Sequence, residues 1–116
     1  VDVLLAMSQQ SLDEYSGSLK DGGILIVDSY MVDDIADEKA VTIPCTLLAI
    51  EECGRQLFAN VIALGAIAEL TGVVEWESLR RAVLARVPQG TEGVNEKALN
   101  VGREAARKTA ARGREG

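Results

Sequence analysis

The sequence predicts an α/β fold of the three-layer α/β/α, Rossmann-like type with a mostly parallel sheet. Two observations indicate it. Aliphatic runs at residues 1–7, with almost no polar interruption, and at residues 24–27 are typical of parallel strands that are buried on both faces. Longer segments with helix start and stop signals lie between and after these runs. The 116 residues suffice for one domain with a sizeable core.

The first part of the chain has the pattern of a βαβ unit. Residues 1–7 form the first strand, and Ser8 can cap a short helix over residues 8–15. The pair Gly22-Gly23 then makes a turn into a second strand, residues 24–27. A short helical connection between two buried strands predicts a right-handed crossover and a parallel pair.

The middle of the chain predicts a surface connection, a strand and a helix. Residues 30–39 are acidic and lack clean periodicity, which favours a surface connection, and residues 40–43 form a short third strand. Pro44 suits the first turn of a helix that continues to residue 53 and ends at Gly54.

The next helix, residues 56–70, has apolar or small residues on every face, interrupted mainly by Asn60 and Glu69. A surface helix would show one apolar stripe, and a membrane span would need about 20 residues. Two interpretations stay open. The helix lies at the centre of a three-layer domain, or its outer face packs against another subunit, with its small residues allowing a close approach.

Two further helices are expected. Residues 76–87 are amphipathic and end at Pro88, and a last helix covers residues 94–112. Its basic end, residues 103–116, could dock on an acidic partner, but a solvated, frayed helix end is the favoured interpretation. We assign it no function.

Composition excludes several function classes. The net charge of −6 and the scarcity of aromatic residues argue against nucleic-acid binding. No histidine is present, so the chain supplies no histidine base or imidazole metal ligand. Cys45 and Cys53 are too few for a four-thiolate site and are interpreted as reduced core residues.

The sequence shows no export signal or membrane span, which predicts a cytoplasmic location. Neither a catalytic residue nor a metal ligand is assigned.

Two motifs resemble nucleotide-binding elements, but each lacks the neighbouring element that such a site needs. Gly22-Gly23 precedes a strand, whereas the glycines of a dinucleotide-binding loop follow one, so the pair is interpreted as a turn. Asp28 ends a strand and could hold a ribose hydroxyl. With no glycine loop upstream, a helix cap or a loop hydrogen bond is the favoured role.

Candidate binding residues lie at the carboxyl ends of the predicted strands, where open α/β sheets bind ligands. Ser8, Gln9 and Ser29 occupy such positions. Asn60 is the one amide in the apolar helix, and if buried it needs a hydrogen-bond partner. A structural role is favoured for Asn60, and a contact with a loop, a ligand or a neighbouring subunit is the alternative.

Six segments, in order, carry a family resemblance that covers residues 1 to about 105. They are DVLLAMSQ (2–9), LKDGGILIVDS (19–29), IPCT (43–46), ANVIALGA (59–66), LTG (70–72) and NEKALNVG (95–102). Together they closely resemble the gamma subunit, or gamma domain, of 2-oxoacid:ferredoxin oxidoreductases. The approach to the last helix, VPQGTE (87–92), is more similar to the 2-oxoglutarate type than to the pyruvate type.

The chain also departs from the family pattern. Family members begin with a strand and a G-x-G-G-Q-G loop, which would precede residue 1. The resemblance therefore implies that residues 1–116 are the carboxyl-terminal two-thirds of a single gamma domain and that the fold is incomplete at its N-terminus. Cys45 stands where the family usually has alanine.

The resemblance implies a function for the assembled enzyme. The holoenzyme oxidatively decarboxylates a 2-oxoacid such as 2-oxoglutarate, passes electrons to ferredoxin and forms an acyl-coenzyme A. Thiamine diphosphate, magnesium and iron–sulfur clusters are expected in alpha, beta and ferredoxin-like partner subunits. This chain is expected to be non-catalytic, with a role in assembly and a share in binding the co-substrate coenzyme A. A pyruvate or indolepyruvate substrate stays open. The alternative is a free-standing Rossmann-like nucleotide-binding module.

Overall fold

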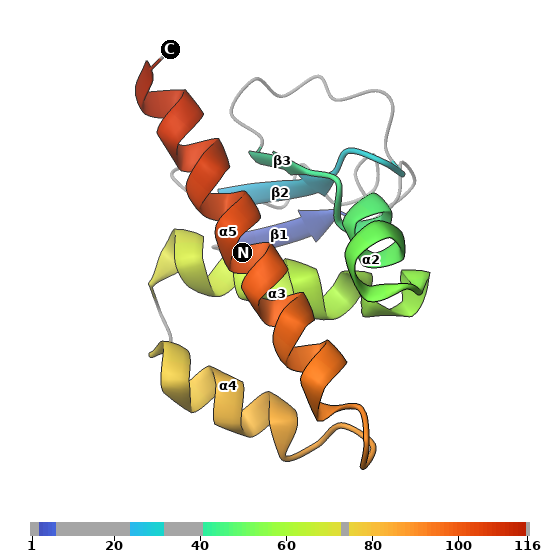
Figure 1. Ribbon diagram of the computed structural model, residues 1–116. Coiled ribbons are helices and arrows are strands. Elements are labelled where there is room, and N and C mark those ends of the chain that lie inside the picture. Colours follow the sequence, from blue (N-terminus) through green and yellow to red (C-terminus); the bar gives the residue numbers. More distant parts are fainter. Residues whose placement is uncertain (1–2, 7–23, 32–40, 73–74, 116) are drawn as a thin grey trace. The chain divides into compact units, whose positions relative to one another are not determined.

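A computed structural model of the chain describes residues 3–6, 24–31, 41–72 and 75–115 (Figure 1). The chain forms two compact units, Val1–Pro44 and Cys45–Gly116. The helix expected at residues 8–15 and the turn at Gly22-Gly23 lie outside the described residues, as does most of the connection expected at residues 30–39.

The first unit contains a parallel sheet. Its strands are β1 (Val3–Ala6), β2 (Ile24–Asp28) and β3 (Val41–Ile43), in the order β1-β2-β3. Both neighbouring pairs are parallel, and Asp28 lies opposite Ile43 in the register. The three predicted strands and their parallel pairing are thus confirmed, and with them the α/β class.

The middle strand is buried on both of its faces. Leu25 is 3% exposed, and Ile26, Val27 and Asp28 are fully buried. Successive side chains of a strand point to opposite faces of the sheet, so four consecutive buried residues require cover on both sides. The uninterrupted apolar run of β2 predicted this burial.

The second unit is helical. It comprises α2 (Cys45–Cys53), the 3-10 turn η2 (Gln56–Phe58), α3 (Ala59–Thr71), α4 (Trp76–Leu84) and α5 (Glu92–Glu115). Each expected helix of this region is present. The differences lie at the ends: the helix expected from residue 56 starts with a separate 3-10 turn, α4 ends three residues early, and α5 starts two residues early and reaches residue 115.

Two glycines end helices as expected. Gly54 and Gly72 have φ angles of 84° and 64°, in the left-handed region that favours glycine. The backbone N–H of Gly72 donates to the Ala68 carbonyl at 3.0 Å, and that of Gly54 donates to the Ile50 carbonyl at 3.2 Å. These bonds satisfy carbonyl groups that a helix end would otherwise leave without a partner.

Helix α5 starts earlier than expected because polar side chains order the turn before it. The Thr91 hydroxyl donates to the Pro88 carbonyl at 2.6 Å, and the Glu92 carboxylate accepts from the Gly90 N–H at 2.8 Å. The side-chain amide of Asn95, which is only 5% exposed, donates to the Thr91 carbonyl at 3.0 Å. The VPQGTE segment therefore contains a hydrogen-bonded turn and the first residue of α5.

Helices α3 and α5 approach each other closely where each carries a glycine. A Cβ atom on Gly65 of α3 would overlap the backbone carbonyl of Leu99, and one on Gly102 of α5 would overlap that of Ile62. Ile62 is fully buried, and Leu99 is 1% exposed. The close approach expected of the small residues in α3 thus takes place, and it is made with α5 of the same chain.

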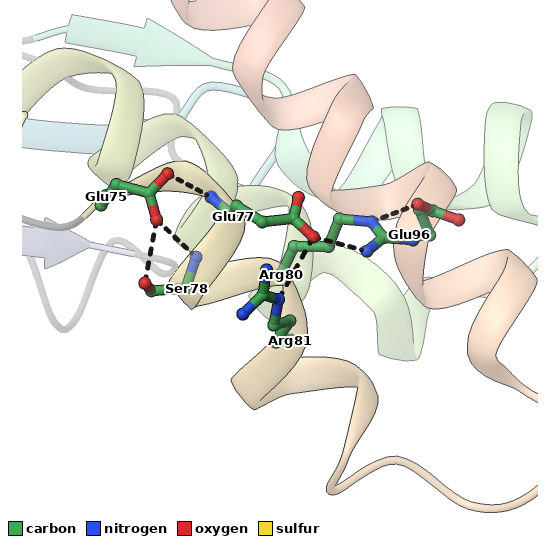
Figure 2. A network of polar contacts seen from close by, with 6 residues as sticks. All are labelled: Glu75, Glu77, Ser78, Arg80, Arg81 and Glu96. Carbon is green, nitrogen blue, oxygen red and sulfur yellow. Dashed lines mark hydrogen bonds and ion pairs between the residues drawn. The ribbon is translucent and has the colours of Figure 1, made fainter.

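Helix α4 begins at a carboxylate cap (Figure 2). The Glu75 side chain accepts from the backbone N–H groups of Ser78 at 2.8 Å and Glu77 at 3.2 Å, and from the Ser78 hydroxyl at 2.9 Å. These bonds, chiefly the one from the Ser78 backbone, lower the pKa of the Glu75 carboxyl group. The charged cap therefore persists into mildly acidic solution and is lost as the pH falls through this lowered pKa.

Among the residues that the structure describes, α4 has no buried side chain, and polar contacts tie it to α5. Arg80 Nε donates to Glu96 on α5 at 2.5 Å, and its Nη1 donates to Glu77 at 3.0 Å (Figure 2). The hydrogen bond that Arg80 donates to Glu96 is the main reason why the pKa of Arg80 is raised. The Arg103 guanidinium also lies 4.4 Å from the centre of the Trp76 ring.

We expect Arg80→Met to loosen α4 from α5 and to speed amide hydrogen exchange in residues 76–84 relative to the wild-type protein. Among the described residues, the substitution removes the only charged group that contacts both Glu77 and Glu96. A salt concentration of 1 M, at which the Debye length is about 3 Å, should also speed exchange because it screens these ion pairs. Arg81→Met is the matched control, because the Arg81 side chain is 76% exposed and its ion pair, with Glu77, lies within α4. Equal exchange in both variants would contradict the role of Arg80.

Candidate functional site

The carboxyl edge of the parallel sheet is the candidate site in the first unit. β1, β2 and β3 end at Ala6, Asp28 and Ile43, and the parallel register brings these ends to the same edge. Ligands of open parallel sheets bind outside this edge, where strands stop and the chain turns away. The described part of the edge is the turn Asp28–Met31, and we call it the β2 turn.

Three hydrogen bonds fix the β2 turn. The Asp28 carboxylate accepts from the Tyr30 N–H at 3.1 Å, and the Asp28 carbonyl accepts from the Met31 N–H at 3.1 Å. The Ser29 N–H donates to the Ile43 carbonyl at the end of β3, at 3.2 Å. The loop hydrogen bond expected of Asp28 is confirmed. Because Asp28 is fully buried, it serves the turn from inside and does not itself face a ligand.

The other residues of the β2 turn are exposed. Ser29, a candidate binding residue, is accessible at the edge as the sequence predicted. Tyr30 is 50% and Met31 45% exposed. In the sequence, these two residues belong to the surface connection predicted for residues 30–39. The signal that points to them is a pair of large apolar residues directly after a polar strand end.

The structure describes only one of the other candidates, Asn60. Ser8 and Gln9 lie outside the described residues. Asn60 lies in the first turn of α3, in the second unit, and its side chain is exposed. The burial that would require a hydrogen-bond partner for Asn60 is therefore not observed, and an exposed amide can bond to water. Contact with a ligand or a neighbouring subunit stays a prediction.

One side of η2 and α3 is exposed. Leu57 is 55% and Leu64 37% exposed, and Asn60 lies between them. Residues 57, 60 and 64 recur at helical spacing and so share a side. We call these three residues the α3 face. The sequence left two interpretations of this helix open. Because one side of α3 is exposed, the helix is not completely enclosed within the domain. Packing of its outer face against another subunit stays a prediction.

The described residues have little reactive chemistry. Cys45 is fully buried, and burial is the main cause that raises the pKa of the Cys53 thiol, which keeps it in the less reactive protonated form. Within the described ranges, no three metal-ligating side chains of His, Cys, Asp or Glu gather at one place. In the same ranges, each helix is too short or too polar to cross a membrane.

Sequence comparison finds one family and several relatives. Residues 1–107 match the family described as pyruvate ferredoxin/flavodoxin oxidoreductase. The chain is 41% identical over 110 residues to 2-oxoglutarate synthase subunit KorC of Methanocaldococcus jannaschii. This alignment covers 91% of the chain and 59% of that relative. It is 35% identical over 113 residues to ketoisovalerate oxidoreductase subunit VorA of Methanothermobacter marburgensis, covering 92% of the chain and 23% of the relative. The chain thus spans about three-fifths of the length of KorC.

Solved structures share the fold. The gamma subunit of a keto/oxoacid ferredoxin oxidoreductase from Geobacter sulfurreducens matches with a TM-score of 0.86 and 41% identity, over 92% of this chain and 64% of that one. The 2-oxoglutarate:ferredoxin oxidoreductase of Magnetococcus marinus matches with a TM-score of 0.74 over 92% of this chain and 20% of that one. At 23% identity, this second likeness concerns the fold alone.

Proposed function

The chain belongs to the pyruvate ferredoxin/flavodoxin oxidoreductase family, and we propose that it acts as a non-catalytic gamma subunit, or gamma domain, of a 2-oxoacid:ferredoxin oxidoreductase in the cytoplasm. The observation that carries this proposal is the 41% identity to 2-oxoglutarate synthase subunit KorC over 110 residues. The proposed reaction of the complex is oxidative decarboxylation of 2-oxoglutarate to an acyl-coenzyme A, with ferredoxin as electron acceptor.

The composition of the chain supports a non-catalytic role within that complex. Each common iron–sulfur cluster needs four ligands, mostly thiolates, and the chain has two cysteines, of which Cys45 is fully buried. It also has no histidine to act as base or ligand. Thiamine diphosphate, magnesium and the clusters are therefore assigned to alpha, beta and ferredoxin-like partner subunits.

The α3 face is the proposed contact with a thiamine-binding partner subunit. Leu57 and Leu64 expose large aliphatic side chains on one side of a short segment, and Asn60 offers an amide between them. Subunit interfaces of permanent complexes combine an apolar centre with a few hydrogen-bonding groups. Asn60 thereby takes the role of a subunit contact rather than that of a ligand-binding residue.

The carboxyl edge of the sheet is the proposed contact with coenzyme A. Ser29 lies exposed there, and its backbone N–H is already bonded to Ile43, so its hydroxyl group is the part that can serve a ligand. Ser8 and Gln9, which follow β1 in the sequence, are proposed to contact coenzyme A as well. The fold neighbour from Magnetococcus marinus was solved with 2-oxoglutarate, coenzyme A and succinyl-CoA bound.

A free-standing nucleotide-binding module is the second candidate, because the same edge of a parallel sheet binds nucleotides in many unrelated proteins. Co-purification separates the two. We expect the protein, co-expressed with the thiamine-binding and ferredoxin-like subunits of its own genome, to purify with them and to give coenzyme A-dependent reduction of ferredoxin by 2-oxoglutarate. The same subunits expressed without it form the control. A monomer that binds nucleotide but no partner would refute the gamma-subunit proposal.

A further inference from the structure

We propose that Tyr30 and Met31 bind the purine ring of coenzyme A, which makes the β2 turn the nucleoside-binding part of the site. This inference rests on the proposed function, because it names the portion of coenzyme A that the carboxyl edge receives. Three properties of the turn lead to it: its rigidity, the chemistry of its exposed side chains, and its charge.

The β2 turn presents its exposed residues from a rigid base. It follows a strand of which Ile26, Val27 and Asp28 are fully buried. The Asp28 carboxylate and carbonyl each hold one N–H of the turn, and Ser29 is bonded to β3. Two large side chains on a fixed backbone lose less conformational entropy on binding than the same side chains on a mobile loop.

The exposed side chains suit a flat aromatic ligand. Tyr30 offers a ring face, and Met31 offers a polarizable thioether that adapts to aromatic surfaces. Single exposed apolar residues are common on protein surfaces and need no explanation. Here two adjacent large ones, 50% and 45% exposed, lie at the edge of a parallel sheet where ligands bind.

Charge selects the part of coenzyme A that binds at this turn. Residues 24–31 include no lysine or arginine, and their one ionisable group other than the Tyr30 phenol is the Asp28 carboxyl. Phosphate groups prefer arginine, lysine or a helix N-terminus, so this turn offers the negatively charged diphosphate and 3′-phosphate no positively charged partner. The uncharged purine ring is the large part of coenzyme A that fits Tyr30 and Met31, with Ser29 available to hydrogen-bond its polar edge. Asp28 is then a positioning residue, because it acts through the backbone of the turn.

The test compares two acyl acceptors in the assembled enzyme. Coenzyme A contains the purine ring, and 4′-phosphopantetheine lacks it. Stacking of a base on an aromatic side chain contributes about 1–3 kcal/mol, so we expect Tyr30→Ala to raise the KM for coenzyme A by about tenfold and to leave the KM for 4′-phosphopantetheine unchanged. Tyr30→Phe keeps the ring and should retain the wild-type KM. Met31→Ala should raise the KM for coenzyme A by a smaller factor.

Ile50→Ala is the matched control, because Ile50 is 42% exposed but lies on α2, in the other unit. Thermal unfolding of each complex verifies that assembly is intact. An unchanged KM for coenzyme A in Tyr30→Ala, or an equal rise for both acceptors, would overturn the inference and leave the proposed function intact. A wild-type complex that consumes no coenzyme A would instead refute the proposed function.

Discussion

Gly102→Ala is expected to destabilise the protein by about 3 kcal/mol, toward the upper end of what overpacking costs. The added methyl group would overlap the backbone carbonyl of Ile62. Backbone cannot swing aside as a flexible side chain can, so α3 and α5 would have to move apart. That movement would open the packing around Leu99, which is 1% exposed. Urea-induced unfolding followed by circular dichroism measures the loss.

Two further substitutions isolate the cause. Gly65→Ala introduces the same kind of overlap from the other helix, with the Leu99 carbonyl, and should also destabilise. Gly93→Ala is the control, because Gly93 lies in the same helix as Gly102 and a Cβ there meets nothing within 4 Å. That variant should be stabilised by up to about 1 kcal/mol, the difference in helix propensity. If Gly102→Ala proved as harmless as Gly93→Ala, the helices could not cross as closely as described.

The strands and helix ends could be predicted from the sequence because local chemistry determines them. The aliphatic run 24–27 is short, β-branched and bounded by turn residues, which is the pattern of a buried strand. Gly54 and Gly72 end helices because their left-handed φ angles favour glycine. The start of α5 was missed because it depends on hydrogen bonds of the polar side chains Thr91, Glu92 and Asn95, which apolar periodicity does not reveal.

The exposed side of α3 could not be predicted, because the helix carries apolar residues on all its sides. The periodicity of the sequence therefore distinguishes no face as the buried one. Which side is buried depends on where Gly102 of α5, 37 residues beyond Gly65, makes contact. The exposed residues of the β2 turn were likewise only partly predictable. Ser29 was predictable as the residue that follows a strand. Tyr30 and Met31 are of types that are common in protein cores, so their position after the strand end points to a ligand only together with their exposure.

The second large effect is expected at the α3 face. Leu64→Lys should abolish co-purification with the thiamine-binding subunits, weakening association by about 100-fold or more, because an interface would have to bury an unpaired ammonium group. Leu64 is 37% exposed, so the lysine chain can reach water in the isolated protein and the fold should tolerate it. Pull-down with a tagged partner subunit gives the association, and thermal unfolding of the free chain verifies the fold.

A matched variant separates a local effect from added charge. Asn100→Lys places the same charge on an exposed position of α5, and it should leave co-purification unchanged. Leu57→Lys, at the other end of the α3 face, should weaken association as Leu64→Lys does, since both leucines are exposed on the same side. Asn60→Ala should weaken it less, because it removes a hydrogen bond without adding a charge. Loss of assembly in Asn100→Lys together with normal assembly in Leu64→Lys would place the partner on α5 instead of the α3 face.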